Sequence, residues 1–375
     1  MEIQYSFSDK LEYVTFRRPS NFHAHLRTEA IMRAIAHDLM RAVRYLLVMP
    51  NDGLIDSPGK VTARFHELVS LAEELEVNPW FVMTVYLTPN VTPQVIEELA
   101  KLPFRVEVKY YPPEQGATTG SGHGLPLTES GETLRAMAEC RMPLLGHFES
   151  VKDKNGRELP HDQRETYFAR EWFPWLRESN PDLLISFEHV STKEGVACIK
   201  QDRDGKTVGT FTPHHSILSI DELKQLSWAN YGKCMPIPKG PDDVDACREF
   251  VTSGDNRVIF GDDTAAHLKE SKVGAFGDAT NGAFWTAHSI AAFAKVFNEA
   301  GALDSRFECF MSLNGVRWRG LLPPDEGDTI TISRVSGKGV PPPIYVPEKN
   351  DVIVPFGWTI ADDGLDIGLE VTRTE

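Results

Sequence analysis

The chain has 375 residues, of which 41% are hydrophobic and 25% are charged, as expected for one large or two medium globular domains. Its formal net charge of -15 repels nucleic acid phosphates and anionic membranes, so we exclude both as partners. The five scattered cysteines form no C-x-x-C pair, which is typical of reduced thiols. No signal peptide and no apolar run of about 20 residues is visible, so we expect a soluble, cytoplasmic protein.

Short apolar runs alternate with helical patterns along the chain. Strands are predicted at 13–16, 45–49, 80–87, 104–111, 142–148, 183–190, 208–213 and 257–261. Apolar residues at helical spacing predict a helix over 61–75, and Thr92 and Ser219 are predicted to cap two later helices. The strand runs are almost continuously apolar, which is typical of parallel strands that are buried on both faces.

Eight strands separated by helices favour a closed (β/α)8 barrel of the TIM type, within the α/β class. The competing fold is an open doubly wound sheet, but no glycine-rich fingerprint follows the first strand. We therefore predict one domain over residues 1–375, with the barrel core at about 13–322. Residues 323–375 are predicted to form a C-terminal extension packed on the barrel, with strand-like pieces at 329–333 and 352–355.

The motif His23-Ala24-His25 follows the first predicted strand. Alternate residues of an extended chain point to the same face, so His23 and His25 can reach one metal ion together. Arg27 follows on that face, and its planar guanidinium suits a carboxylate on the substrate. Taken alone, such a motif is about as often a pair of ordinary surface histidines.

Polar residues end most of the other predicted strands. They are Asn51, Lys109, His147, His189, His214, His215, Asp262 and Asp263, with His267 shortly after. Each has a structural alternative: a single histidine is more often a hydrogen-bonded structural residue, Lys109 could pair with Glu107, and Asp263 could cap a helix. However, several independent strand ends carry residues that can bind a metal or an anion. This joint pattern favours one functional site at the mouth of the barrel.

The strings at these positions resemble the dihydroorotases of the single-domain bacterial type, within the amidohydrolase superfamily. The segments that carry the resemblance are 22–27, 48–51, 108–112, 117–119, 142–147, 187–193, 211–215, 263–267 and 312–315. The resemblance spans roughly residues 14–322, and the combination of motifs is highly specific, although each motif alone is weak.

The resemblance implies two zinc ions per subunit, held by His23, His25, Lys109, His147, His189 and Asp263. Lys109 is expected to bridge the two ions as a carbamate, because an ammonium cannot bind a cation whereas a carbamate is an anionic ligand with two oxygens. A hydroxide that bridges the ions is the expected nucleophile. Asp263 is expected to act as the general base and then as the general acid.

The resemblance also assigns the substrate contacts. They are Arg27, Asn51 and His267 for the carboxylate, the backbone of Met235 for the ring, and Thr118 and Thr119 on a loop that closes over the substrate. The chain departs from the family pattern in three places, one of which is the segment 274–278, which partly replaces a helix and lacks the cysteines of some relatives. The segment before Thr118 is about two residues longer than in the best-known bacterial members, and Ala266 stands where proline is common. These departures bear on rate and substrate preference.

The expected reaction is the reversible hydrolysis of (S)-dihydroorotate to N-carbamoyl-L-aspartate in de novo pyrimidine biosynthesis, by a homodimer. One alternative keeps the fold and the metals but changes the substrate, as in a hydantoinase or an imide hydrolase; Arg27 speaks against it because those substrates need no carboxylate anchor. A second alternative is a metal-free scaffold, although no expected ligand is missing. A mononuclear deaminase lacks the bridging lysine that Lys109 supplies.

Overall fold

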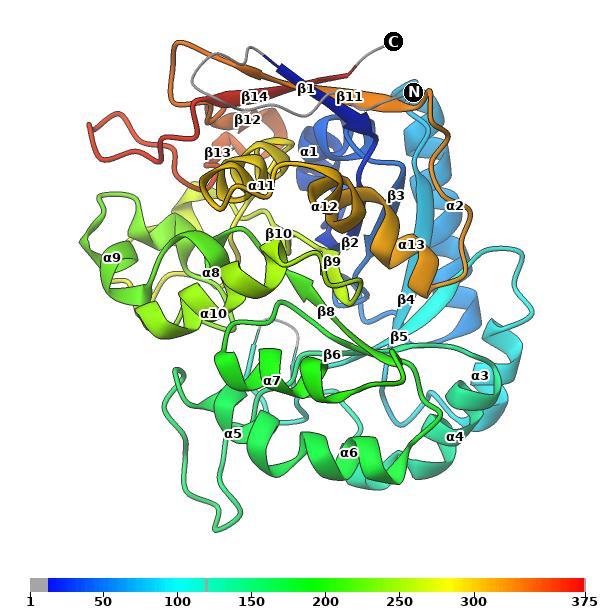
Figure 1. Ribbon diagram of the computed structural model, residues 1–375. Coiled ribbons are helices and arrows are strands. Elements are labelled where there is room, and N and C mark those ends of the chain that lie inside the picture. The colour runs from blue at the N-terminus through cyan, green and yellow to red at the C-terminus, as the bar shows by residue number, and fades with distance from the viewer. Residues whose placement is uncertain (1–12, 119–120, 374–375) are drawn as a thin grey trace.

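In the computed structural model, which describes residues 13–118 and 121–373, a curled parallel sheet forms the centre of the molecule (Figure 1). Its strands lie in the order β10-β2-β3-β4-β5-β6-β7-β8-β9. They are β2 (Ser20–His25), β3 (Tyr45–Val48), β4 (Trp80–Tyr86), β5 (Val106–Tyr110), β6 (Leu144–Gly146), β7 (Ile185–Phe187), β8 (Thr207–Phe211), β9 (Val258–Phe260) and β10 (Thr264–Ala265). Each neighbouring pair is parallel, as the continuous apolar runs predict.

The sheet closes into a barrel because its last strand returns to its first. β10 pairs with β2 through Thr264 opposite Ala24 and Ala265 opposite His25. Residues 261–263 separate β10 from β9, so the two form one interrupted eighth strand. The backbone N–H of Asp263 donates to the carbonyl of His23 over 3.0 Å. The predicted (β/α)8 barrel is confirmed, and closure brings the ends of its first and last strands side by side.

Helices cover the outside of the barrel (Figure 1). They are α1 (Glu29–Arg41), α2 (Pro58–Glu74), α3 (Pro93–Leu99), α4 (Gly131–Glu139), α5 (Arg164–Glu171), α6 (Phe173–Ser179), α7 (Lys193–Gln201), α8 (His214–Ile217), α9 (Ile220–Gln225), α10 (Pro241–Thr252), α11 (His288–Glu299), α12 (Ser305–Glu308) and α13 (Asn314–Trp318). Thr92 and Ser219 cap α3 and α9 as predicted. The helix predicted from residue 61 begins at Pro58, because Ser57 caps it and proline suits the first helical position. None of the helices in the described part of the chain is both long and apolar enough to cross a membrane.

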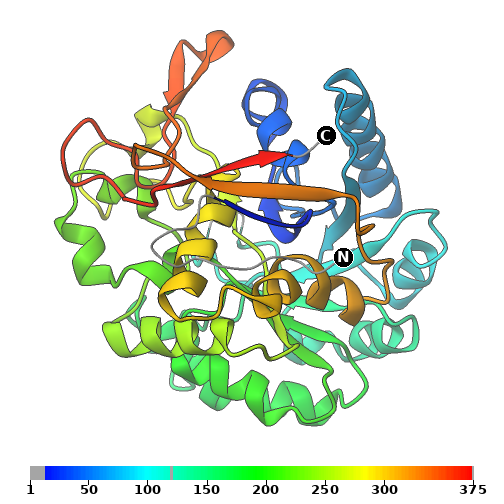
Figure 2. The same ribbon diagram turned by 45° about the horizontal axis from the view of Figure 1, so that its top comes forward.

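The first predicted barrel strand is wrong. β1 (Tyr13–Arg17) pairs antiparallel with β11 (Thr329–Arg334), which pairs with β14 (Leu369–Arg373) in a separate sheet that lies across one end of the barrel (Figure 2). The H-x-H motif instead lies inside β2. Burial explains the difference: β2 is buried at every position, whereas β1 buries Val14 and Phe16 but exposes Tyr13. Alternating burial is typical of a sheet that covers a core on one face.

The C-terminal segment reaches back toward the barrel. Strands β12 (Ile344–Val346) and β13 (Asp351–Ile353) form a hairpin, and buried Phe356 stacks on Trp285, with 4.4 Å between the ring centroids. Trp285 in turn donates from Nε1 to Nδ1 of His214 over 3.1 Å. The segment therefore packs behind one wall of the barrel mouth, while the division into a core and an extension at residue 322 stays a prediction.

Candidate metal centre and substrate pocket

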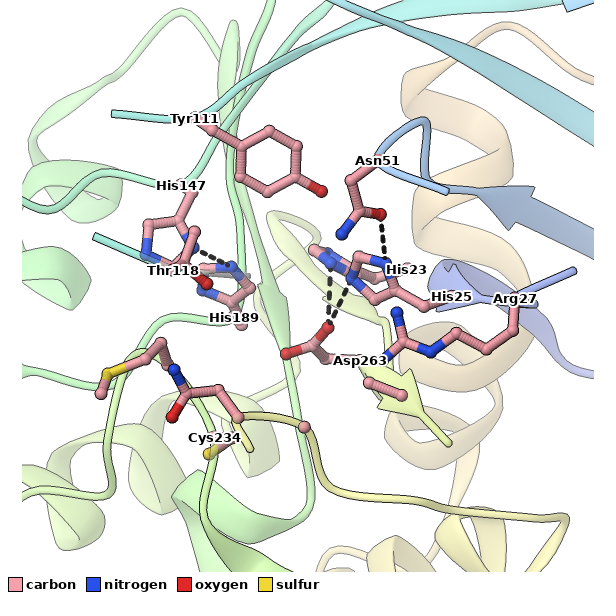
Figure 3. A pocket seen from close by; sticks show the side chains of 14 residues that line it. His23, His25, Arg27, Asn51, Tyr111, Thr118, His147, His189, Cys234 and Asp263 are labelled. Carbon is pink, nitrogen blue, oxygen red and sulfur yellow. Dashed lines mark hydrogen bonds and ion pairs between the residues drawn. The ribbon is translucent and has the colours of Figure 1, made fainter. Parts of the chain in front are cut away.

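The two histidines of the H-x-H motif meet Asp263 at the mouth of the barrel (Figure 3). Nε2 of His23 lies 3.1 Å from Oδ1 of Asp263, and Nε2 of His25 lies 3.2 Å from the same oxygen. All three residues are buried. The positive φ of Asp263, 50°, turns the chain between β9 and β10 at this point. Strand alternation and barrel closure thus build the first group of candidate ligands.

A second group lies beside the first. Nδ1 of His147, after β6, is 3.1 Å from Nε2 of His189, after β7. The ring centroids of His189 and His23 are 5.1 Å apart. The ligand atoms of His23, His189 and Asp263 all lie within 4.8 Å of one another. The two groups therefore form one continuous cluster, which brings these predicted ligands together.

Lys109 in β5 completes the cluster. Its side chain is fully buried, and among the described residues its Nζ has no hydrogen-bond partner. Burial lowers the pKa of Lys109 to about 8, although the carboxylates of Glu188 and Asp263 oppose that shift. The suggested pairing with Glu107 is not formed, because Glu107 accepts from Arg319 at 3.0 and 3.1 Å. Lys109 is therefore a buried amine without a hydrogen-bond partner, and its Nζ lies 4.9 Å from the ring centroid of Tyr111.

Buried acceptors orient the ring nitrogens that face away from the cluster. Nδ1 of His23 lies 2.5 Å from Glu188, and Nε2 of His147 lies 2.7 Å from Glu149. Nδ1 of His25 lies 2.7 Å from Oδ1 of Asn51. Such outer acceptors fix the tautomer and orientation of histidines that bind metals. Sequence reasoning missed both glutamates, although Glu188 directly precedes one predicted ligand and Glu149 follows another by two positions.

The donor set fits two zinc ions. Zinc ligands at about 2.0–2.2 Å in tetrahedral geometry place neighbouring ligand atoms roughly 3.3 Å apart, close to the separations observed here. Burial lowers the pKa values of His25, His147 and His189, which favours the neutral imidazole that metals require. Burial raises the pKa of Asp263, but His23 and His25 outweigh it and hold that pKa well below its usual range. The carboxylate is therefore an anionic ligand.

A cavity opens over the cluster and encloses about 370 Å³, part of it open to solvent. Its lining comprises His23, His25, Arg27, Asn51, Tyr111, Thr118, His147, His189, Cys234, Met235, Asp263, Ala265, Asn281 and Gly282. Figure 3 shows Tyr111 and Cys234 on opposite sides of it. Sequence reasoning did not single out Tyr111, Cys234, Asn281 or Gly282.

Of the predicted carboxylate-binding residues, Arg27 and Asn51 line this cavity, whereas His267 is not among the lining residues and contacts Arg27. Arg27 donates from Nη1 to Asp52 over 3.2 Å and from Nε to the carbonyl of Ala266 over 2.8 Å, so its guanidinium is held in place. Its Nη2 lies 2.8 Å from Nε2 of His267. Burial and the neighbouring Arg27 lower the pKa of His267 to about 2, so this imidazole is neutral.

The remaining predicted contacts are placed in part. Met235 lines the cavity and precedes Pro236 through a cis peptide bond. Thr118 also lines the cavity, whereas Thr119 lies outside the described residues. Asn51 lines the cavity, but its Oδ1 contacts His25, which gives it a role in orienting a ligand beside its predicted role in substrate binding.

A second cluster of metal-type residues, His214, His215 and Cys234, lies nearby. Both ring nitrogens of His215 are engaged, with Thr212 at 2.8 Å and the carbonyl of Pro236 at 2.9 Å. Burial raises the pKa of the Cys234 thiol far above its ordinary value, which disfavours the thiolate that metals bind. Of these three residues only Cys234 lines the cavity, and we assign no metal ion to the cluster.

Comparison with known proteins agrees with the geometry. No family model matches the sequence. A dihydroorotase of Novosphingobium aromaticivorans is 34% identical over 366 residues, which cover 93% of this chain and 99% of that protein. A dihydroorotase of Sinorhizobium medicae is 32% identical over 360 residues, or 94% of this chain and 100% of that protein.

Solved structures show the same fold. A dihydroorotase from Saccharomyces cerevisiae in complex with 5-fluoroorotic acid superimposes with a TM-score of 0.83 at 24% identity, over 97% of this chain and 99% of that chain. A dihydroorotase from Campylobacter jejuni gives 0.78 at 23% identity, over 96% and 97%. An L-hydantoinase from Arthrobacter aurescens gives 0.70 at 14% identity, over 96% and 89%. With relatives above 30% identity over nearly its whole length, the chain belongs to the dihydroorotase family, whose members are hydrolases that act on a cyclic amide.

Proposed function

We propose that the protein hydrolyses (S)-dihydroorotate reversibly to N-carbamoyl-L-aspartate, as a step of de novo pyrimidine biosynthesis. One observation carries the proposal: a buried cluster of imidazoles and a carboxylate lines one small cavity together with an arginine, and a buried lysine without a hydrogen-bond partner belongs to the same cluster. The cluster suits hydrolysis of an amide, and the arginine suits a substrate that carries a carboxylate.

His23, His25 and Asp263 would hold one zinc ion, His147 and His189 a second, and Lys109 would join the two as a carbamate. When bound, the two ions supply an activated water and an electrophile for the amide carbonyl. The lowered pKa of Lys109, about 8, supports its modification, because the neutral amine is the form that attacks carbon dioxide. Its nitrogen forms a bond to the carbon of CO2 and releases one proton, which leaves an anionic carbamate.

Asp263 is the proposed proton carrier. Its carboxylate is ionised at neutral pH, lines the cavity and lies 3.1 Å from Nε2 of His23 and 3.2 Å from Nε2 of His25. It takes a proton from the attacking water and returns that proton to the nitrogen of the amide as the ring opens. Ring closure runs through the same proton transfer in reverse. Buried Glu188 and Glu149 hold the histidines in the required orientation.

The other end of the cavity is proposed to receive the substrate carboxylate. Arg27, Asn51 and His267 supply its hydrogen bonds, and Arg27 is held by Asp52 and Ala266 before any ligand arrives. A chain with a net charge of -15 repels an anion at long range, and the positive charge of Arg27 offsets this repulsion locally. Met235, and Thr118 with Thr119, are the proposed contacts to the ring and the closing loop.

The alternative within the same fold is a hydantoinase or imide hydrolase, and the hydantoinase neighbour keeps it open at the level of fold. Arg27 favours dihydroorotate because a hydantoin lacks the carboxylate that this guanidinium suits. Turnover of hydantoin above that of dihydroorotate would reverse the ranking. We also propose a homodimer in the cytoplasm, on the family resemblance, and light scattering of the purified protein tests the dimer.

The test is to purify the protein with zinc and bicarbonate and to follow both the loss of dihydroorotate and the closure of carbamoyl-aspartate. We expect activity in both directions with two zinc ions per chain. Inactivity with two ions bound would redirect the assignment to other cyclic amides, and inactivity without metal would point to a scaffold protein.

Arg27→Met separates the proposed substrate from a neutral one. Loss of a charge-assisted hydrogen bond worth about 1.5–3 kcal/mol predicts a KM for dihydroorotate raised by roughly tenfold to a hundredfold. The control is Arg33→Met, which removes an exposed guanidinium on α1 that pairs with Glu74. An Arg27 variant with wild-type efficiency on dihydroorotate would refute the proposed substrate pose.

A further inference from the structure

Lys272 is a buried lysine outside the metal centre. It ends a 3-10 turn (Lys269–Lys272) beyond β10, and its exposed fraction is 4%. Its Nζ donates to three backbone carbonyls: those of Thr280 and Gly282, each at 2.7 Å, and that of Lys233 at 3.2 Å. An ammonium has three donors, so all of them are used. The acceptors belong to two chain segments, before Cys234 and around 280–282.

A second lysine strengthens the same junction. Lys233 is also buried, and its Nζ donates to the carbonyls of Gly277 at 2.6 Å and Ala279 at 2.5 Å. The backbone N–H of Gly282 donates to the carbonyl of Lys233 over 2.8 Å. The two lysines therefore tie residues 277–282 to the segment that begins at residue 233.

Both tied segments form the cavity wall. Cys234 and Met235 come from the first segment, and Asn281 and Gly282 from the second. A Cβ added at Gly282 would lie 2.8 Å from the imidazole of His267, so the backbone there packs directly against this ring. His267 also forms a hydrogen bond with the backbone of Asn281. The position of His267 thus depends on the junction that Lys272 holds.

Lys272 is a basic group that an anionic ligand at this end of the cavity would keep in its charged form. Among the described residues neither Lys272 nor Lys233 forms an ion pair with a carboxylate; their recorded acceptors are carbonyls. The pKa of Lys272 falls to about 7, mainly through burial and also through Lys233 and then Arg27, and Lys272 in turn lowers the pKa of His267. Lys272, Arg27 and His267 are thus within electrostatic reach of one another. A buried charge without a counter-ion is costly, and an anionic ligand would offset that cost.

We propose that Lys272 is a positioning residue for the substrate carboxylate: it fixes the wall formed by residues 233–235 and 280–282, holds His267 against Arg27, and is kept charged there by the bound carboxylate. The inference rests on the proposed function, because it takes dihydroorotate as the substrate. Lys272 acts through His267 and the backbone, and does not itself contact the reacting amide.

The experiment compares Lys272→Met, Lys272→Gln and Lys272→Arg in the zinc-loaded enzyme, with Lys269→Met as the matched control. Lys269 is exposed on the same turn. We expect the Met and Gln variants to raise the KM for dihydroorotate by about tenfold, the scale of one hydrogen bond to a charged group. Zinc content should stay at the wild-type level and kcat should change by less than about threefold, since the metal centre is untouched. Lys272→Arg should restore part of the affinity, and the control should match the wild type.

Calorimetric binding of 5-fluoroorotate gives a readout that needs no turnover, and its Kd should weaken in parallel with KM. Unchanged KM and Kd in the Met and Gln variants would overturn the proposal, as would a loss of kcat alone. If Lys272→Met does not fold, equal KM values for the Gln and Arg variants overturn it. A wild-type enzyme that binds 5-fluoroorotate but leaves dihydroorotate unchanged would refute the proposed function, while the binding data still decide the role of Lys272.

Discussion

Glu107 and Lys109 lie two residues apart on β5, on the same side of the strand, and both are fully buried. Glu107 lies at the base of the barrel, where the guanidinium of Arg319 donates to both of its oxygens at 3.0 and 3.1 Å. Arg319 also stacks over Phe22, 4.1 Å from the ring centroid. Lys109 lies at the mouth, and its Nζ has no hydrogen-bond partner among the described residues.

The base of the barrel carries a paired buried charge that stabilises the fold, whereas the mouth carries the groups that are available for chemistry. At the base, a buried charge finds its counter-ion within the chain. At the mouth, the protein leaves an amine and several imidazole nitrogens open toward one another. Buried polar groups without partners are costly, and they persist where a ligand completes them. Four predictions test this division, from the largest expected effect to the smallest.

Lys109→Ala should abolish function without harming the fold. We expect kcat/KM for dihydroorotate to fall by about a thousandfold or more, roughly 4 kcal/mol, because the bridging ligand is lost. The metal-free variant should be at least as stable as metal-free wild type in urea, since the change removes a buried amine that has no hydrogen-bond partner. A variant that binds two zinc ions and keeps its activity would contradict the assignment of Lys109.

Glu107→Gln should lower the stability of the protein and leave its activity unchanged. It leaves the Arg319 guanidinium buried without its anionic partner, which costs about 3–5 kcal/mol of unfolding free energy. Activity per folded molecule should remain that of the wild type. Urea denaturation measures the loss, and Glu74→Gln is the control, because its exposed pair with Arg33 is worth less than about 1 kcal/mol. A matching loss of kcat would show that base and mouth are not independent.

A buried histidine near the mouth should also make the stability of the metal-free protein depend on pH. Burial lowers the pKa of His214 to about 4, against about 6.5 in the unfolded chain. The stabilisation that neutral His214 gives the folded protein is fully present above pH 6.5. It is lost as the pH falls toward 4, because this histidine takes up a proton at a higher pH in the unfolded chain than in the folded chain. His214→Gln should flatten the stability profile over that range, by up to about 3 kcal/mol. An unchanged slope in urea denaturation between pH 4 and 6.5 would contradict this.

The buried glutamates behind the histidines should tune the metal affinity. Glu188→Gln and Glu149→Gln should each weaken zinc binding by about tenfold to a hundredfold, as the loss of an outer carboxylate does. The control is Glu165→Gln, an equally buried glutamate that accepts from Ser191 and Thr192 and faces no candidate ligand. Competition with a zinc chelator measures the affinity. Equal zinc affinity in all three variants would remove the glutamates from the metal centre.

Several features of the site follow from local sequence alone. A strand has a period of two residues, so His23 and His25 share a face wherever the strand lies. Parallel strands present their C-terminal ends at one edge, so Lys109, His147 and His189 had to gather there once eight strands were recognised. The caps at Thr92 and Ser219 depend on neighbours within three residues and were predicted correctly.

Other features depend on partners far apart in the chain, and only the tertiary structure decided them. β1 pairs with β11 more than 300 residues away, so its half-buried pattern could not reveal its sheet. The same holds for β10 closing onto β2, for Glu188 facing His23 and for Arg319 reaching Glu107. The residue types of the candidate metal centre are therefore properties of the sequence. The partners that orient its histidines, and the lysine that secures the cavity wall, are properties of long-range packing, which no local pattern encodes.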